Sequence, residues 1–157
     1  MNFLFPIPAA LVGPVSSGLK FGAQRTTHSH EGVDLAWNKA GTPVLAAASG
    51  VVSASNAISG DGRPWGVYID HGDGWQTRYL HLADDGFAIA KGRSVYAGEQ
   101  IGTVGALASG PHLHFEVRRN GVPVNPEPVL QASSGGNLLV MVLAGVAAYY
   151  LWRWWRY

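Results

Sequence analysis

The sequence predicts an all-β fold, an antiparallel sheet over residues 1–130, followed by a single hydrophobic C-terminal helix. Between residues 20 and 130 there is no long 3.6-residue periodicity, and short runs of Val, Ile, Ala, Tyr and Thr alternate with glycine-rich turns. Charged residues make up 13% of the 157 residues, about half the roughly 25% of ordinary domains. Aromatic residues make up 11%, so a disordered chain is excluded.

Charge and cysteine content narrow the possible functions. The net charge of +1 gives no reason to expect nucleic acid as a partner. The chain has no cysteine, which excludes disulfides, thiolate metal sites and a cysteine nucleophile. Any metal must therefore be bound by histidine and carboxylate side chains.

The expected elements are short strands joined by turns. The apolar N-terminus predicts an extended lead-in strand rather than a signal peptide, because it lacks a basic region and Pro6 and Pro8 interrupt it. Further strands are expected at residues 44–46, 51–52, 66–70, 75–82 and 100–104. Strict alternation along 75–82 predicts one face shared by Trp75, Thr77, Tyr79 and His81.

Residues 112–118 form the clearest predicted strand. Its apolar side chains, Leu113, Phe115 and Val117, point to one face. The opposite face carries His112, His114, Glu116 and Arg118. The Asn-Gly pair at 120–121 predicts a two-residue hairpin after this strand.

Two of the histidine pairs, His28/His30 and His112/His114, have i, i+2 spacing. In a strand such residues share a face, so one imidazole can bind a metal while the other reaches a metal-bound water. For an isolated pair, polar residues on the wet face of a strand are the simpler interpretation. The string from His30 to Asp34 adds an imidazole and a carboxylate, both suitable for zinc.

The same string resembles the H-E-x-x-H motif of helical zinc proteases, with Asp34 in place of the second histidine. Gly32 and Val33 disfavour the helix that this motif requires. A catalytic zinc site has three protein ligands and one open position for water. His30, Asp34 and His114 would supply such a set, leaving His112 and His81 as candidates for proton transfer.

Several stretches together carry a resemblance to one family. They are Phe21-Gly22 with Arg25, residues 30–36, 41–44, 50–52, 70–74, 79–82 and 109–117. With these motifs the chain resembles the lysostaphin/LytM-type zinc metalloendopeptidases, which cut peptidoglycan peptides. The resemblance covers about residues 5 to 130 and implies their antiparallel sheet of barrel-sandwich hybrid type.

The resemblance implies a role for each matching residue. His30, Asp34 and His114 are implied as ligands of one zinc ion with water as fourth ligand, and His81 and His112 as the catalytic pair. It implies no catalytic role for His71, in the hairpin. His28 has no counterpart and is expected at the surface. Glu116 is either a hydrogen-bond acceptor that orients a ligand imidazole or a solvated strand residue.

The C-terminal end has a different character. Residues 131–137 have the composition of a Ser/Gly linker, and 138–152 are 15 uncharged, mostly apolar residues. Counted to Trp155 the stretch has 18 residues, about 27 Å as a helix against the roughly 30 Å of a hydrocarbon core. Five Tyr and Trp residues resemble an interfacial belt, with Arg153 and Arg156 as a cytoplasmic anchor. A transmembrane helix is predicted over 138–157; a helix packed on the domain or on a partner is the alternative.

These features predict a zinc endopeptidase of peptidoglycan cross-links, anchored in a membrane or a membrane-embedded assembly through residues 138–157. The anchor would place the peptidase domain on the cell-wall side, although no ordinary export signal is recognised. A virion-associated lysin for cell entry, in a virion membrane, resolves that conflict. The alternatives are a tail-anchored hydrolase of the bacterial inner membrane and a structural or regulatory protein, such as a hydrolase activator, with a vestigial peptidase fold.

Overall fold

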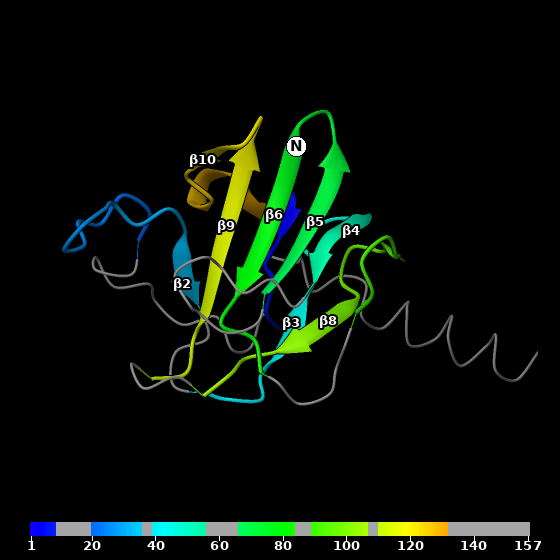
Figure 1. Cartoon of the computed structure of the whole chain (residues 1–157), viewed down its shortest axis with the longest axis horizontal. Helices are drawn as coiled ribbons and strands as arrows, with labels where there is room; N and C mark the ends of the chain where they lie inside the picture. Colours follow the sequence, from blue (N-terminus) through cyan, green and yellow to red (C-terminus); the bar gives the residue numbers. More distant parts are fainter. Residues whose placement is uncertain (9–19, 36–38, 56–65, 84–88, 107–109, 132–157) are drawn as a thin grey trace, which may run out of the picture.

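A twisted antiparallel sheet forms the centre of the domain (Figure 1). The computed structural model describes residues 1–8, 20–35, 39–55, 66–83, 89–106 and 110–131. The order along the sheet is β10–β9–β6–β5–β4–β7, and β2 also pairs with β9. Its strands are β2 (Val33–Leu35), β4 (Gly50–Ser55), β5 (Gly66–Gly72), β6 (Trp75–Leu80), β7 (Ser94–Val95), β9 (Leu113–Arg119) and β10 (Val122–Val124).

Two smaller sheets complete the architecture. Strand β3 (Pro43–Leu45) pairs antiparallel with β8 (Gln100–Thr103). Strand β1 (Phe3–Leu4) pairs in parallel with β11 (Leu130–Gln131), which follows a short 3₁₀ turn, η3 (Glu127–Val129). Phe3 and Ile7 are buried in the core, so the apolar N-terminus is part of the folded domain, as the predicted lead-in strand requires.

The faces of β9 divide the molecule into a core side and a polar side. Leu113, Phe115 and Val117 are fully buried in the apolar core, where the Phe115 ring lies 5.3 Å from that of Tyr79. The other face carries His114 and Glu116, as the alternation of the sequence predicts. The predicted hairpin after β9 is also confirmed, because Asn120 and Gly121 both have positive φ angles, +50° and +80°, as a type I′ turn requires.

One predicted side-chain direction is wrong. Thr77 and Tyr79 point into the core as expected, but His81 does not continue their alternation. Strand β6 ends at Leu80, and His81 has a φ of +67°. A left-handed residue breaks the two-residue repeat of a strand, so the imidazole points to the polar side instead.

The described residues contain no α-helix, which agrees with the predicted all-β class. No helix in those parts of the chain is long and apolar enough to cross a bilayer. Of the linker predicted at 131–137, Gln131 belongs to β11, whereas residues 132–137 and the hydrophobic helix predicted at 138–157 lie outside the described residues.

Candidate metal and catalytic site

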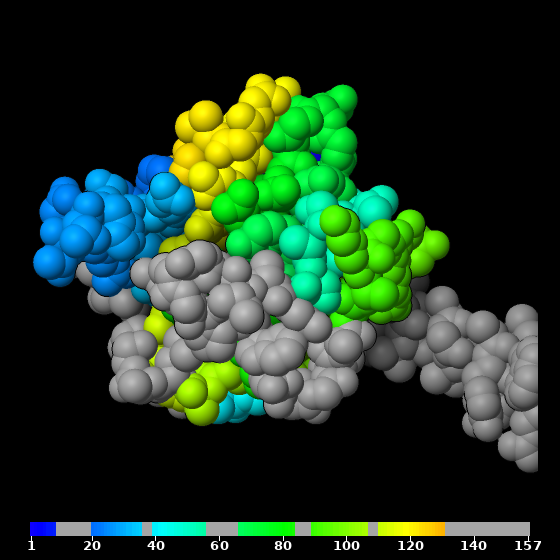
Figure 2. Space-filling model, viewed as in Figure 1, coloured from blue at the N-terminus to red at the C-terminus, as the bar shows by residue number. Residues whose placement is uncertain are grey.

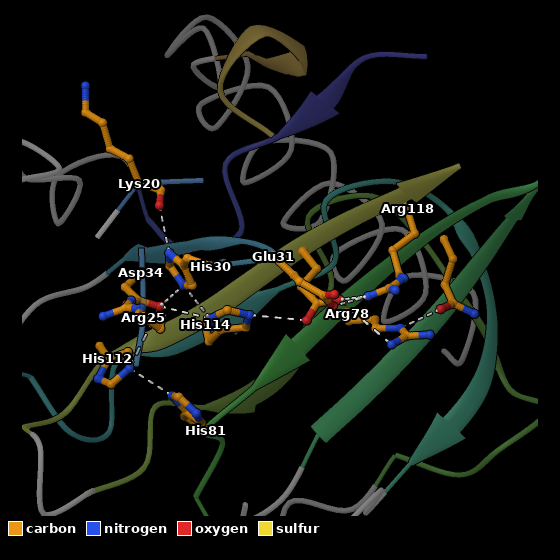
Figure 3. A network of polar contacts seen from close by, with 12 residues as sticks. Lys20, Arg25, His30, Glu31, Asp34, Arg78, His81, His112, His114 and Arg118 are labelled. Atoms are coloured by element: carbon orange, nitrogen blue, oxygen red, sulfur yellow. Dashed lines mark hydrogen bonds and ion pairs between the residues drawn. The ribbon is translucent and has the colours of Figure 1, made fainter. Parts of the chain in front are cut away.

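Three buried side chains from two separate segments meet near the start of β9 (Figure 3). Nε2 of His30 lies 3.1 Å from Oδ1 of Asp34 and 2.9 Å from Nδ1 of His114. The third side of this triangle, from His114 Nδ1 to Asp34 Oδ1, is 3.0 Å. Within the described chain, these residues form the one group whose donor atoms have metal-ligand spacing. The structure thus brings together the three ligands that the sequence predicts.

Strand pairing places these side chains. Asp34 in β2 lies directly opposite His114 in β9, and His30 lies three positions before the first residue of β2. Gly32 allows this approach, because a Cβ at that position would clash with the Phe115 carbonyl oxygen and lie 2.9 Å from His114 Nε2. The segment from 33 to 35 is a strand, which excludes the helical H-E-x-x-H arrangement.

The partners of the outward-facing atoms determine which lone pairs point into the triangle. Nδ1 of His30 lies 2.8 Å from the Lys20 carbonyl oxygen, which can only accept, so Nδ1 carries the proton. Nε2 of His114 lies 3.2 Å from Oε1 of Glu116 and donates to that carboxylate in the same way. In their neutral forms, both imidazoles therefore present a lone pair to the triangle.

A cation fits this arrangement better than any pattern of hydrogen bonds. With both imidazoles neutral, two ring lone pairs and a carboxylate oxygen of Asp34 converge with no proton between them, which is repulsive unless a positive charge, a metal ion or a proton on His114, joins them. Zinc bonds of about 2.0–2.1 Å in tetrahedral geometry separate two ligand atoms by about 3.3 Å, close to the sides of the triangle. The donor set, two nitrogens and one oxygen, is also one that zinc accepts.

The electrostatics of the cluster favour an ionised carboxylate. Burial alone would raise the pKa of Asp34, but hydrogen bonds and Coulomb attraction from His114 and His30 hold it well below its ordinary value. Burial would lower the pKa of His114, but its contacts with Asp34 and Glu116 raise it. A proton and a metal ion compete for the same Nδ1 lone pair of His114, so metal affinity falls as the pH falls.

Charged residues on β9 hold the second ring nitrogen of His114. Glu116 is buried, and Arg118 Nη1 donates to its Oε2 over 2.6 Å while Oε1 faces His114. The same Arg118 nitrogen lies 3.0 Å from Oε2 of Glu31, next to the ligand His30. Arg118 therefore connects the strand that carries one predicted ligand to the loop that carries another. Glu116 accepts a hydrogen bond from His114 and is not a solvated strand residue.

A second histidine pair lies beside the triangle. Nδ1 of His81 lies 2.9 Å from Nε2 of His112, and the two rings meet edge to face at 4.6 Å. His112 Nδ1 donates to the Gly110 carbonyl oxygen over 2.9 Å, so its Nε2 is turned toward the site, 3.9 Å from Asp34 Oδ1. Both rings are buried. The pair can accept one proton next to the metal position.

The remaining histidines lie elsewhere. His28 is exposed, as expected, and its Nδ1 contacts the Thr27 hydroxyl. His71 contacts Ser49 and Thr77 on the core side of the sheet. Sequence reasoning did not identify the Lys20 and Gly110 carbonyl groups that fix two imidazoles, because a backbone acceptor has no residue signature. It also gave Arg25 no role, although this side chain contacts Asp34.

Comparison with known proteins places this geometry in a family. The sequence model of Peptidase family M23 matches residues 28–126, which include all five site residues, four histidines and Asp34. The chain belongs to Peptidase family M23. Its M23 domain is 44% identical over 106 residues to "DD-carboxypeptidase/endopeptidase Mpg" of Neisseria meningitidis serogroup B, covering 66% of this chain and 23% of that protein. It is 37% identical over 108 residues to "Murein hydrolase activator NlpD" of Escherichia coli, covering 68% and 27%.

Solved structures share the fold of the M23 domain. A zinc-containing peptidase from Vibrio cholerae is 30% identical with a TM-score of 0.66, over 80% of this chain and 39% of that chain. Lysostaphin from Staphylococcus simulans is 28% identical with a TM-score of 0.63, over 79% and 54%. The chain spans about a quarter of the length of the two curated relatives named above.

Proposed function

We propose that this chain is a zinc-dependent endopeptidase that hydrolyses peptide cross-links of bacterial peptidoglycan. The observation that carries the proposal is the convergence of three lone pairs, from His30, Asp34 and His114, beside a histidine pair that can move a proton. The triangle of His30, Asp34 and His114 alone would fit a structural metal site. The pair of His81 and His112 alone would fit a packing contact in the core. Together they match the needs of amide hydrolysis, an electrophile and a proton carrier.

Zinc at this position supplies Lewis-acid polarisation of the scissile carbonyl and acidifies a water molecule toward a pKa of about 7. His81 and His112 take up the proton that the attacking water loses and return it to the leaving amine. His112 Nδ1 is occupied by its hydrogen bond to the Gly110 carbonyl oxygen. The two rings therefore pass a proton between them through His112 Nε2 and His81 Nδ1. Burial of both rings excludes competing water and strengthens these interactions.

Substrate class and activity are inferred for this chain from its family. The supporting facts are the M23 match, the relative named a DD-carboxypeptidase/endopeptidase, and the structural likeness to a zinc-containing peptidase. The relative named a murein hydrolase activator supports a second candidate, a regulator without catalysis of its own. All five proposed site residues are present here, which favours the enzyme.

Digestion of purified sacculi tests the enzyme against the regulator. The full chain is incubated with sacculi in the presence of zinc, and the released muropeptides are identified by mass spectrometry. We expect a new amine and a new carboxylate at one cross-link position, and no release by His114→Ala. Bound zinc with unchanged muropeptides, together with stimulation of a separate wall hydrolase, would favour the regulator.

We also propose that residues 138–157 anchor the chain in a membrane, with the peptidase domain facing the cell wall. This rests on sequence alone, on the 15 uncharged residues and the aromatic and arginine residues that follow them. A virion membrane and a bacterial inner membrane are both proposed settings. Membrane fractionation of cells that express the chain with or without residues 138–157 tests the anchor. We expect the truncated chain to be lost from the membrane fraction.

A further inference from the structure

Of Arg25 and Arg118, the two arginines that flank the metal triangle in the described chain, Arg25 makes fewer hydrogen bonds. Its Nη2 donates to Oδ2 of Asp34 over 3.0 Å, on the oxygen that does not face the triangle. The Arg25 side chain is 37% exposed. The side chain of Arg118, which binds the Glu116 carboxylate beside His114, is 12% exposed. Figure 3 shows the two arginines at opposite ends of the cluster, with Arg25 at the end of Asp34 and His112.

The backbone holds Arg25 at this place. It begins the turn of a tight hairpin, in which Arg25 N donates to the His28 carbonyl and Gln24 pairs with Ser29. The hairpin leads directly to His30, so Arg25 and this ligand are positioned by the same segment. Residues 20–35 form a lobe that projects beside β9 (Figure 2). The guanidinium is therefore fixed at one end by Asp34 and open to an incoming ligand at the other.

A count of donors shows what such a ligand must offer. A guanidinium carries five N–H donors in a rigid planar fork, and the structure assigns one nitrogen of Arg25 a side-chain acceptor. The edge that faces away from Asp34 matches the two oxygens of a carboxylate. By contrast, Arg118 already contacts two carboxylates and the Gly121 carbonyl.

We propose that Arg25 determines specificity by binding a free carboxylate on the substrate residue whose amine leaves. The position follows from His112, whose Nε2 lies 3.9 Å from Oδ1 of Asp34 while Arg25 holds Oδ2. The pair that protonates the leaving amine and the open edge of Arg25 thus flank the same carboxylate of Asp34. A carboxylate carried by the carbon next to the leaving nitrogen would lie between them.

The proposal deepens the proposed function and rests on it. The reaction remains amide hydrolysis, in which the carbonyl carbon gains a hydroxyl group and the amine leaves with one proton. Cross-links whose leaving residue has an unblocked α-carboxyl group would be preferred. A bridge of internal glycines, where that carboxyl group is tied up in the next amide, would be a poor substrate because the edge of Arg25 would stay unpaired.

The alternative role for Arg25 is to position Asp34 and nothing more. A pair of matched substrates separates the two roles: a dimeric muropeptide with a free α-carboxylate on the leaving residue, and the same dimer amidated at that group. Loss of a positioning residue lowers kcat/KM for both dimers by the same factor. Loss of a carboxylate-binding residue changes the ratio between them.

We expect the zinc-loaded full chain to prefer the carboxylate dimer by about 10- to 100-fold in kcat/KM, the range for a hydrogen-bonded charge. In Arg25→Gln that ratio should fall toward 1, and Arg25→Lys should keep part of it. Arg93→Gln is the matched control, because Arg93 is also exposed and contacts one carboxylate, Glu99, away from the site. It should leave the ratio unchanged.

A ratio near 1 in the unchanged chain, or an equal loss on both dimers in Arg25→Gln, would overturn the proposal. Binding of the two dimers to the zinc-loaded chain, measured by calorimetry, separates this failure from that of the proposed function. If neither dimer is cut but the carboxylate dimer binds at least 10-fold tighter in an Arg25-dependent manner, the carboxylate site stands and the enzyme does not.

Discussion

Two histidine networks lie on opposite faces of the same sheet, and they differ in whether each hydrogen-bond acceptor has a proton donor of its own. On the polar face, His30, Asp34 and His114 turn three acceptors toward one point. On the core face, His71 begins a chain in which each acceptor has its own donor. Both networks contain imidazole groups about 3 Å from oxygen or nitrogen partners, so distance alone does not distinguish them.

The core network can be followed from end to end. His71 Nδ1 donates to the Ser49 carbonyl oxygen over 2.9 Å, so Nε2 accepts from the Thr77 hydroxyl at 2.8 Å. Thr77 Oγ1 in turn lies 2.9 Å from Tyr79 Oη, which accepts the Ala47 amide. Burial raises the pKa of Tyr79, so its hydroxyl stays protonated in the hydrogen bond with Thr77. No charge or metal is needed to satisfy this chain.

The number of protons available to the acceptors, and not the number of histidines, therefore distinguishes a candidate metal site from a structural network. A self-satisfied chain stabilises the fold and gains nothing from a cation. A set of converging lone pairs is destabilising by itself and gains from a cation. Substitutions in the two networks should therefore differ in their effects on zinc content and on stability.

Replacing Asp34 should have the largest effect, because it removes the anionic acceptor of the triangle. In Asp34→Ala we expect zinc content to fall to background after dialysis and muropeptide release to be lost. The matched change on the core side is His71→Gln, which should retain zinc. Metal analysis and sacculus digestion are the measurements. Equal zinc content in both variants would contradict the contrast between the networks.

Replacing His81 should remove turnover but not the metal. Asn is the informative substitute, because it tolerates the left-handed backbone that His81 adopts at φ +67°. For His81→Asn we expect unchanged zinc binding and a fall in kcat of about 10²- to 10⁴-fold, the usual contribution of general acid–base catalysis. Circular dichroism provides the control for folding. Full activity in this variant would remove His81 from the mechanism.

Replacing Glu116 should weaken the metal site without abolishing it. In Glu116→Gln the anionic acceptor for His114 Nε2 is lost, together with the ion pair to Arg118. Loss of such a partner typically lowers metal affinity about 10- to 100-fold. Competition titration with a zinc chelator measures the change, and Glu99→Gln, whose carboxylate pairs with Arg93 elsewhere, is the control. An unaltered zinc affinity would show that the Lys20 and Asp34 contacts suffice to orient the ligands.

The core network should make stability weakly dependent on pH. Burial lowers the pKa of His71 below its ordinary 6.5, although the contacts with Ser49 and Asp70 oppose this. The unfolded chain thus takes up a proton first, and the stabilisation present above about pH 6.5 declines as the pH falls. The Tm advantage of the unchanged chain over His71→Gln should shrink between pH 7.5 and 5.5. Because His71 is partly exposed, the effect should be small.

Much of the fold could be predicted from local patterns. The alternation of Leu113, Phe115 and Val117 indicated the buried face of β9, and Asn120-Gly121 indicated the hairpin, because both signals depend on neighbouring residues. His81 is the exception. Its side-chain direction depends on one left-handed residue at the end of β6, and Gly105 packs against its carbonyl from a distant segment. Nothing in residues 75–82 signals that contact.

Residue types and their spacing were enough to name the atoms that could bind a metal: they excluded thiolates and pointed to His30, Asp34 and His114. Folding of the chain selects which nitrogen of each imidazole faces the site. That choice depends on Lys20, Glu116 and Gly110, which become partners through folding. Folding also determines that Arg25 keeps an open edge beside Asp34 while Arg118 does not. Residue type fixes the number of donors and acceptors, but pairing them requires distances that exist only once the strands have met.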